Sequence, residues 1–97
     1  MPATELMHVA AAGDATALRA AIKEGGCELE ARDEENSATA FLWACVKGSV
    51  ECMQLLADAG CDTAAMNNSG KSGMDLARRK GHDAAATRLQ ALLEERK

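Results

Sequence analysis

Three segments of this 97-residue chain repeat one pattern, in which a Thr or Ser is followed nine residues later by Gly. The segments begin at Thr4, Thr39 and Ser72, so they start 35 and then 33 residues apart. A unit of this length cannot bury its apolar face alone and must stack on its neighbour. The chain is therefore predicted to form one domain over residues 1–97. The predicted units span residues 4–38, 39–71 and 72–97.

Each unit is predicted to contain two short helices. Within the first part of a unit, small and apolar residues recur at i, i+3 and i+4, as at Phe41, Ala44 and Cys45, and this spacing is typical of one helix face. A second apolar stripe predicts helices over residues 15–24 and 50–59. The predicted fold class is therefore all-α, a solenoid of three helix-turn-helix units.

The segments between the helix pairs are rich in turn-forming residues. Gly25 and Gly60 each follow the first Gly of their unit by twelve residues, and both are predicted to end the second helix in a left-handed conformation. The sequence Asn-Asn-Ser-Gly at 67–70 predicts a tight turn between two short extended arms. Ser72 is predicted to cap the next helix. The units are therefore predicted to be joined by hairpin-like loops.

The composition excludes several classes of function. Fifteen acidic and eleven basic residues give a net charge of -4, and aromatic residues make up only 2% of the chain, so no nucleic-acid partner is expected. No apolar stretch approaches the roughly 18 residues that suggest a membrane span, so no membrane partner is expected. The start of the sequence shows no secretion signal. We expect a cytoplasmic or nuclear protein.

The repeat resembles that of the ankyrin family, whose pattern is a turn, Thr-Pro-Leu-His-x-Ala-Ala, Gly-His, a second helix and Gly-Ala-Asp-Val-Asn-Ala. The middle unit matches most closely: residues 39–48 resemble the first helix, residues 50–56 the second and residues 60–65 the exit. The resemblance covers essentially the whole chain. It implies an ankyrin-repeat solenoid that binds other proteins through loop tips and a concave helix face, with no cofactor and no chemistry of its own.

The chain departs from the family pattern in two respects. None of the three units keeps the family's Pro or His, so the hydrogen bonds that this His makes between neighbouring loops lose their usual donor. The first loop is also two residues longer than the second, fourteen against twelve when each is counted from its Gly to the next Thr or Ser. The extra residues are placed at Gly25–Gly26 and near Asn36–Ser37, and this loop is expected to be distorted or mobile.

Four cysteines, Cys27, Cys45, Cys52 and Cys61, are the first candidates for chemistry. They fall where the family has small or aliphatic residues, and they lack the C-x₂₋₄-C spacing of a zinc site. Reduced thiols that fill the core are therefore favoured. The alternative function is a thiol-based metal or redox sensor that uses these four residues.

Signals for catalysis are weaker still. Gly70-Lys71-Ser72 is similar to the end of a phosphate-binding loop, but the full signature needs a Gly where Ala65 stands. His8 and His82 are the only imidazoles, and neither has a nearby nucleophile or a spaced set of carboxylates. We predict no catalytic residue, no metal site and no cofactor, and we expect His82 to be structural.

Binding to another protein, as an adaptor, inhibitor or scaffold, is therefore the favoured function. Trp43, the sole Trp, lies on the flank that lines the groove in the ankyrin architecture, with His8 and Leu76 at the matching positions. It either contacts the partner or covers a neighbouring loop, and the sequence leaves both open. Charged loop tips and helix ends are expected to steer association. The predicted contacts are Asp33, Glu34, Glu35, Trp43, Val46, Lys47, Asn68, Lys71, Arg79 and Lys80.

A stack of three repeats is close to the smallest that is stable by itself. We therefore expect a free energy of unfolding at the low end of about 5 to 15 kcal/mol. A monomer is expected, and weak self-association through the two end faces is a third hypothesis.

Overall fold

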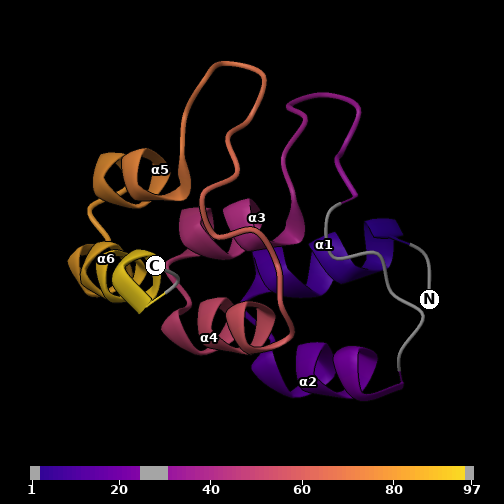
Figure 1. Ribbon diagram of the computed structural model, residues 1–97. Coiled ribbons are helices and arrows are strands. Elements are labelled where there is room, and N and C mark those ends of the chain that lie inside the picture. Colours follow the sequence, from indigo (N-terminus) through magenta and orange to yellow (C-terminus); the bar gives the residue numbers. More distant parts are fainter. Residues whose placement is uncertain (1–2, 25–30, 96–97) are drawn as a thin grey trace.

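The computed structural model describes residues 3–24 and 31–95 and places six helices in them (Figure 1). The helices are α1 (Ala3–Ala12), α2 (Ala15–Glu24), α3 (Ala40–Lys47), α4 (Val50–Asp58), α5 (Gly73–Arg79) and α6 (Asp83–Glu95). In these two stretches the only β-type pairing is an isolated antiparallel bridge between Met66 and Ser72. The predicted all-α fold class is therefore confirmed.

The helices lie in two layers, with α1, α3 and α5 in one and α2, α4 and α6 in the other (Figure 1). In the first layer α3 contacts both α1 and α5, and in the second α4 contacts both α2 and α6. The middle helix pair is thus covered on both sides, as a solenoid requires. The loops that lead into α3 and α5 project beyond the first layer (Figure 1).

Capping side chains set the starts of α3 and α5. The hydroxyls of Thr39 and Ser72 each accept a hydrogen bond of 3.3 Å from the backbone N–H three residues later. Asp75 accepts in return from the backbone N–H of Ser72 and completes a capping box. Gly60 follows α4 with φ of 97°, which confirms the predicted left-handed end. Gly25, predicted to play the same part, lies outside the described residues.

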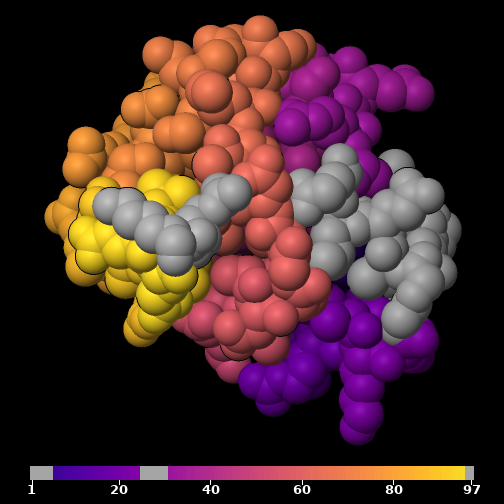
Figure 2. Space-filling model, in the orientation of Figure 1, coloured from indigo at the N-terminus to yellow at the C-terminus, as the bar shows by residue number. Residues whose placement is uncertain are grey.

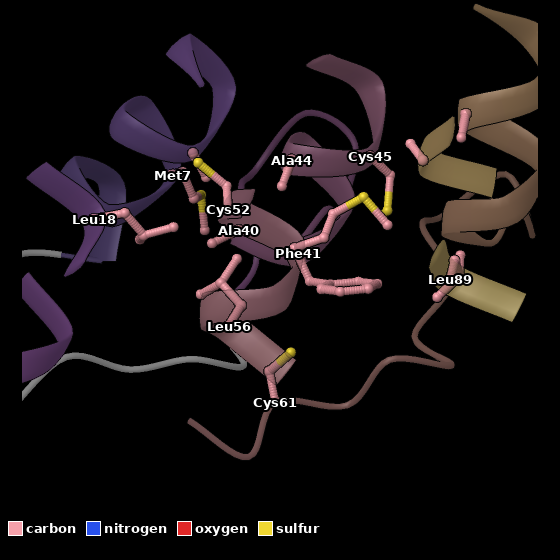
Figure 3. Close-up of a cluster of buried hydrophobic side chains, with 14 of the residues drawn as sticks. Met7, Leu18, Ala40, Phe41, Ala44, Cys45, Cys52, Leu56, Cys61 and Leu89 are labelled. Carbon is pink, nitrogen blue, oxygen red and sulfur yellow. The ribbon is translucent and has the colours of Figure 1, made fainter. Parts of the chain in front are cut away.

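The core lies between the two layers and runs through all three units. Phe41, which is 1% exposed, lies among Cys45, Leu56 and Leu89 (Figure 3). Other buried members of the cluster include Leu6, Ala10, Leu18, Ala21, Ala44, Cys52, Met53, Ala77, Ala85 and Leu92. Gly73 leaves room for a neighbouring side chain, since a Cβ added there would lie 2.6 Å from the Sγ of Cys45.

The second loop has the predicted hairpin form. At its tip the N–H of Asn67 donates to the carbonyl of Lys71, and the N–H of Gly70 donates to the carbonyl of Asn67, both at 3.0 Å. The side-chain Oδ1 of Asn67 accepts two further backbone hydrogen bonds, from Ser69 at 2.9 Å and Lys71 at 3.0 Å. Gly70 turns the chain with φ of 74°.

The first loop is distorted near its tip. Ser37 has φ of 53°, and among the described residues it is the only non-Gly residue with a positive φ. This agrees with the distortion predicted near Asn36–Ser37. The other predicted insertion, at Gly25–Gly26, lies outside the described residues.

Candidate functional site

Two hollows lie where the projecting loops meet the layer of α1, α3 and α5. The first, of about 240 Å³, is lined by Met7, His8, Ala11, Asp33 and Trp43. The second, of about 200 Å³, is lined by Asn36, Ala38, Trp43, Val46, Asn67 and Leu76. Trp43 lines both hollows, so together they form one shallow groove across the three units, which we call the Trp43 groove. His8 and Leu76 lie on either side of Trp43, as the repeat register predicted.

Asp33 holds the indole of Trp43 in this groove. Its Oδ2 accepts a hydrogen bond of 2.9 Å from the Nε1 of Trp43. Its Oδ1 accepts from the backbone N–H of Asn36 at 2.7 Å and of Ala38 at 3.4 Å. Both oxygens of this predicted partner contact are thus engaged within the protein. Trp43, which is half-buried, covers the first loop and also lines both hollows, so it combines the two alternatives that the sequence left open.

These hydrogen bonds change the titration of Asp33. Burial raises the pKa of its carboxyl. The hydrogen bonds from Asn36, Trp43, Ala38 and Ser37 together lower the pKa by more than burial raises it, so the pKa of Asp33 lies below the ordinary value. Because the folded-state pKa is below that of the unfolded chain, ionised Asp33 stabilises the fold above about pH 4. This contribution is lost as the pH falls through the lowered pKa.

Asp33→Asn is expected to lower the free energy of unfolding by about 1 to 3 kcal/mol, because the amide cannot accept from Trp43 and from both backbone groups as the carboxylate does. Urea titration followed by circular dichroism measures the loss, and the emission of Trp43 should move to longer wavelength as the indole loosens. Glu34→Gln, at the exposed neighbouring carboxylate, is the control. The difference between Asp33→Asn and the unmodified protein should shrink below about pH 4. An equal effect of both substitutions would contradict the role of Asp33.

Hydrogen bonds also tie the two loops to each other. The backbone N–H of Asn68 donates to the carbonyl of Asn36 at 2.9 Å, and its side-chain Nδ2 donates to the carbonyl of Glu35 at 3.1 Å. The Nη1 of Arg32 donates to the carbonyls of Ser37 and Met66, both at 2.7 Å. Figure 2 shows the tips side by side at the top of the molecule. Arg32 and Asn68 therefore connect neighbouring loops although the usual His is missing.

The remaining predicted contacts fall into two groups. Glu34 and Glu35 are exposed at the tip of the first loop, and Lys71 is exposed where the second loop returns toward α5. Exposed cations lie at the C-terminal ends of α3 and α5, away from the loops. They are Lys47 at the end of α3, Arg79 at the end of α5 and Lys80 directly after it.

The aliphatic stem of Lys47 has a defined place. A Cβ added at Gly13 would lie 3.1 Å from its Cγ, so the stem crosses the end of α1. Within residues 3–24 and 31–95, one ion pair is observed, between Arg19 of α2 and Glu51 of α4 at 3.2 Å. The charges beside the groove are therefore not paired with one another.

His82 links the second and third units. Its Nε2 lies 3.0 Å from the carbonyl of Val46, and because a carbonyl only accepts, this nitrogen carries the proton. The ring also covers Gly48, where an added Cβ would lie 2.5 Å from the Cγ of His82. The structural role expected for His82 agrees with this geometry.

The cysteines within the described residues are buried. Cys45 and Cys52 are free thiols, and Cys61 is buried with them. Burial raises the pKa of Cys45 to about 12 and also raises the pKa of Cys52. No group of three or more His, Cys, Asp or Glu side chains in the described part of the chain could hold a metal ion. Cys27, the fourth member of the predicted thiol set, lies outside it.

Cys45 in the folded protein is expected to react with Ellman's reagent at pH 7.4 roughly a thousandfold more slowly than an unperturbed thiol, because its raised pKa leaves little thiolate. The same protein in urea, where the thiols are exposed, is the control. A fast phase in the folded protein that disappears in Cys45→Ala would contradict this expectation and would support the thiol-sensor alternative.

Some groove residues were not anticipated. Ala11 lies one repeat of 35 residues before Val46, so the repeat register could have found it. Asn36 and Asn67 carry no comparable signal, because their place in the groove depends on where two loops meet in space. The same holds for Arg32, which connects the loops beside the groove.

None of the helices in residues 3–24 and 31–95 has the length and apolar character needed to cross a membrane.

Comparison with known proteins gives a family match and matches to solved structures. A family model described as ankyrin repeats, in three copies, matches residues 6–95. The structure is similar to the crystal structure of the human ASB11 ankyrin repeat domain, with a TM-score of 0.82 and 24% sequence identity. The match covers 90% of this chain and 38% of that chain, so this chain spans well under half the length of its structural relative. At this identity the likeness shows the fold alone.

Proposed function

This chain belongs to the ankyrin-repeat family, and from that premise we propose that it is a non-catalytic protein-binding module that acts as an adaptor, inhibitor or scaffold. Ankyrin repeats generally bind other proteins. We propose that contact is made through the Trp43 groove and the two loop tips, the first of which carries the exposed charges of Glu34 and Glu35.

The observation that carries this proposal is the position of Trp43. Large aromatic side chains in pockets often dominate the binding energy of protein interfaces. Trp43 lines both hollows and is oriented by the carboxylate of Asp33, so little side-chain freedom is lost when a partner binds.

The expected monomer has separate support. Among the described residues, Met66 is the only large hydrophobic side chain that is exposed, at 54%. The described surface therefore offers no broad apolar face for self-association. Sedimentation over a range of concentrations tests this expectation.

Affinity capture from separate cytosolic and nuclear fractions tests the proposed function. The unmodified protein should capture a protein that Trp43→Ala fails to retain. Arg88→Ala, on the exposed surface of α6, is the matched control and should retain it. Circular dichroism must first show that both variants are folded. Equal retention by Trp43→Ala would contradict the proposed site.

A further inference from the structure

We propose that the Trp43 groove receives an amphipathic helix of another protein, with its apolar stripe facing Trp43 and charges of opposite sign on its two flanks. This inference rests on the proposed function, because it names the chemistry of the partner for the same surface.

The floor of the groove requires apolar side chains from the partner. The two hollows lie on either side of Trp43, one toward His8 and the other toward Val46 and Leu76. Packed helices of neighbouring units lie about 8 to 10 Å apart, so the two hollows are separated by about the same distance. Residues seven apart on one helix face are separated by about 10.5 Å. An apolar stripe at i, i+3 or i+4, and i+7 therefore matches the spacing.

The first loop makes its part of one side of the groove acidic. Glu34 and Glu35 are exposed at the turn between Asp33 and Asn36, and each of these flanking residues lines a hollow. The carboxylate of Asp33 is already bonded to Trp43, so Glu34 and Glu35 are the charges presented to a partner.

The opposite side is basic. Lys47 follows Trp43 by four residues on α3, and Arg79 and Lys80 follow Leu76 by three and four residues. Side chains at these spacings share one helix face, so the cations lie beyond the floor, at the helix ends away from the loops.

A helix satisfies these requirements better than an extended peptide. The partner must direct apolar groups to the floor and charges to both sides, which are three directions. Successive side chains of an extended strand point in only two opposite directions. A helix presents an apolar stripe with a polar flank on each side. The partner's basic flank then faces Glu34 and Glu35, and its acidic flank faces Lys47, Arg79 and Lys80.

The test uses synthetic helical peptides of about 15 residues, which span the groove at about 1.5 Å per residue and contain no Trp. All share one Leu stripe, and the flanks are Lys on one side and Glu on the other, Lys on both, Glu on both, or Gln on both. Because Trp43 is the sole Trp, its emission reports binding directly. At low salt the two-sign peptide should bind about 5- to 10-fold more tightly than the Gln peptide, and both one-sign peptides should bind more weakly than the two-sign peptide.

A charge reversal in the protein sharpens the test. The double variant Glu34→Lys/Glu35→Lys makes both sides of the groove basic. The peptide with Glu on both flanks should then become the tightest binder. Glu94→Lys/Glu95→Lys makes the same change of net charge on α6 and should leave the order of the four peptides unchanged.

Several results would overturn the inference. Equal binding of all four peptides would do so, as would the absence of any change in Trp43 emission. The same reordering of the peptides by the α6 variant would also contradict it. Undiminished binding of a two-sign peptide interrupted by Pro would indicate an extended occupant. A concentration-dependent emission change without peptide would assign the groove to a second copy of the chain. Loss of a captured protein in Trp43→Ala would still support the proposed function in each case.

Discussion

Phe41→Ala is expected to lower the free energy of unfolding by about 3 to 5 kcal/mol. Phe41 is 1% exposed and lies in α3, which packs against both α1 and α5. Its removal leaves a cavity that a short two-layer stack can close only partly. Because a three-repeat stack has little stability to lose, the variant should be largely unfolded at physiological temperature.

Urea titration at low temperature, followed by circular dichroism, measures this loss. Met66→Ala is the control, because it removes a long side chain from an exposed position and should change stability by no more than about 0.5 kcal/mol. Similar midpoints for the two variants would show that Phe41 does not occupy the centre of the core.

Gly48→Ala is expected to lower the free energy of unfolding by about 2 to 5 kcal/mol, whereas Gly81→Ala should cost only about 1 to 2 kcal/mol. The two glycines have nearly the same left-handed backbone, with φ of 78° and 76°. They differ in what surrounds them. An added Cβ at Gly48 would lie 2.5 Å from the Cγ of His82, whereas at Gly81 it would meet nothing within 4 Å.

A double-substitution cycle separates strain from collision. The backbone strain is common to both glycines, so the extra loss at Gly48 must come from displacing His82 and its hydrogen bond to Val46. In a His82→Ala background, Gly48→Ala should therefore cost no more than Gly81→Ala. An unchanged cost in that background would assign the whole effect to the backbone.

Much of the fold could be predicted from the sequence because it depends on local and periodic signals. The helix predicted over residues 15–24 is observed with those bounds, and the one predicted over residues 50–59 ends one residue earlier. Ser72 and Gly60 act at helix ends as predicted, since caps depend on the conformation of a few neighbouring residues.

The groove was only partly predictable. The repeat register placed His8 and Leu76 beside Trp43, because equivalent residues of stacked units fall in one row. The engagement of Asp33 with Trp43 was not foreseen. A carboxylate in a run of acids carries no sequence signal that distinguishes an internal hydrogen bond from an exposed charge.

The repeat period, the helix pairs, several of their caps and the apolar faces that must meet all follow from spacing along the chain, so they could be predicted before the structure was known. Three contacts became visible only in the folded molecule: Asp33 fixes Trp43, Arg32 and Asn68 join the loops, and His82 covers Gly48. These contacts join residues brought together by folding. Their hydrogen bonds require distances near 3 Å, which depend on how whole units stack and not on any local pattern.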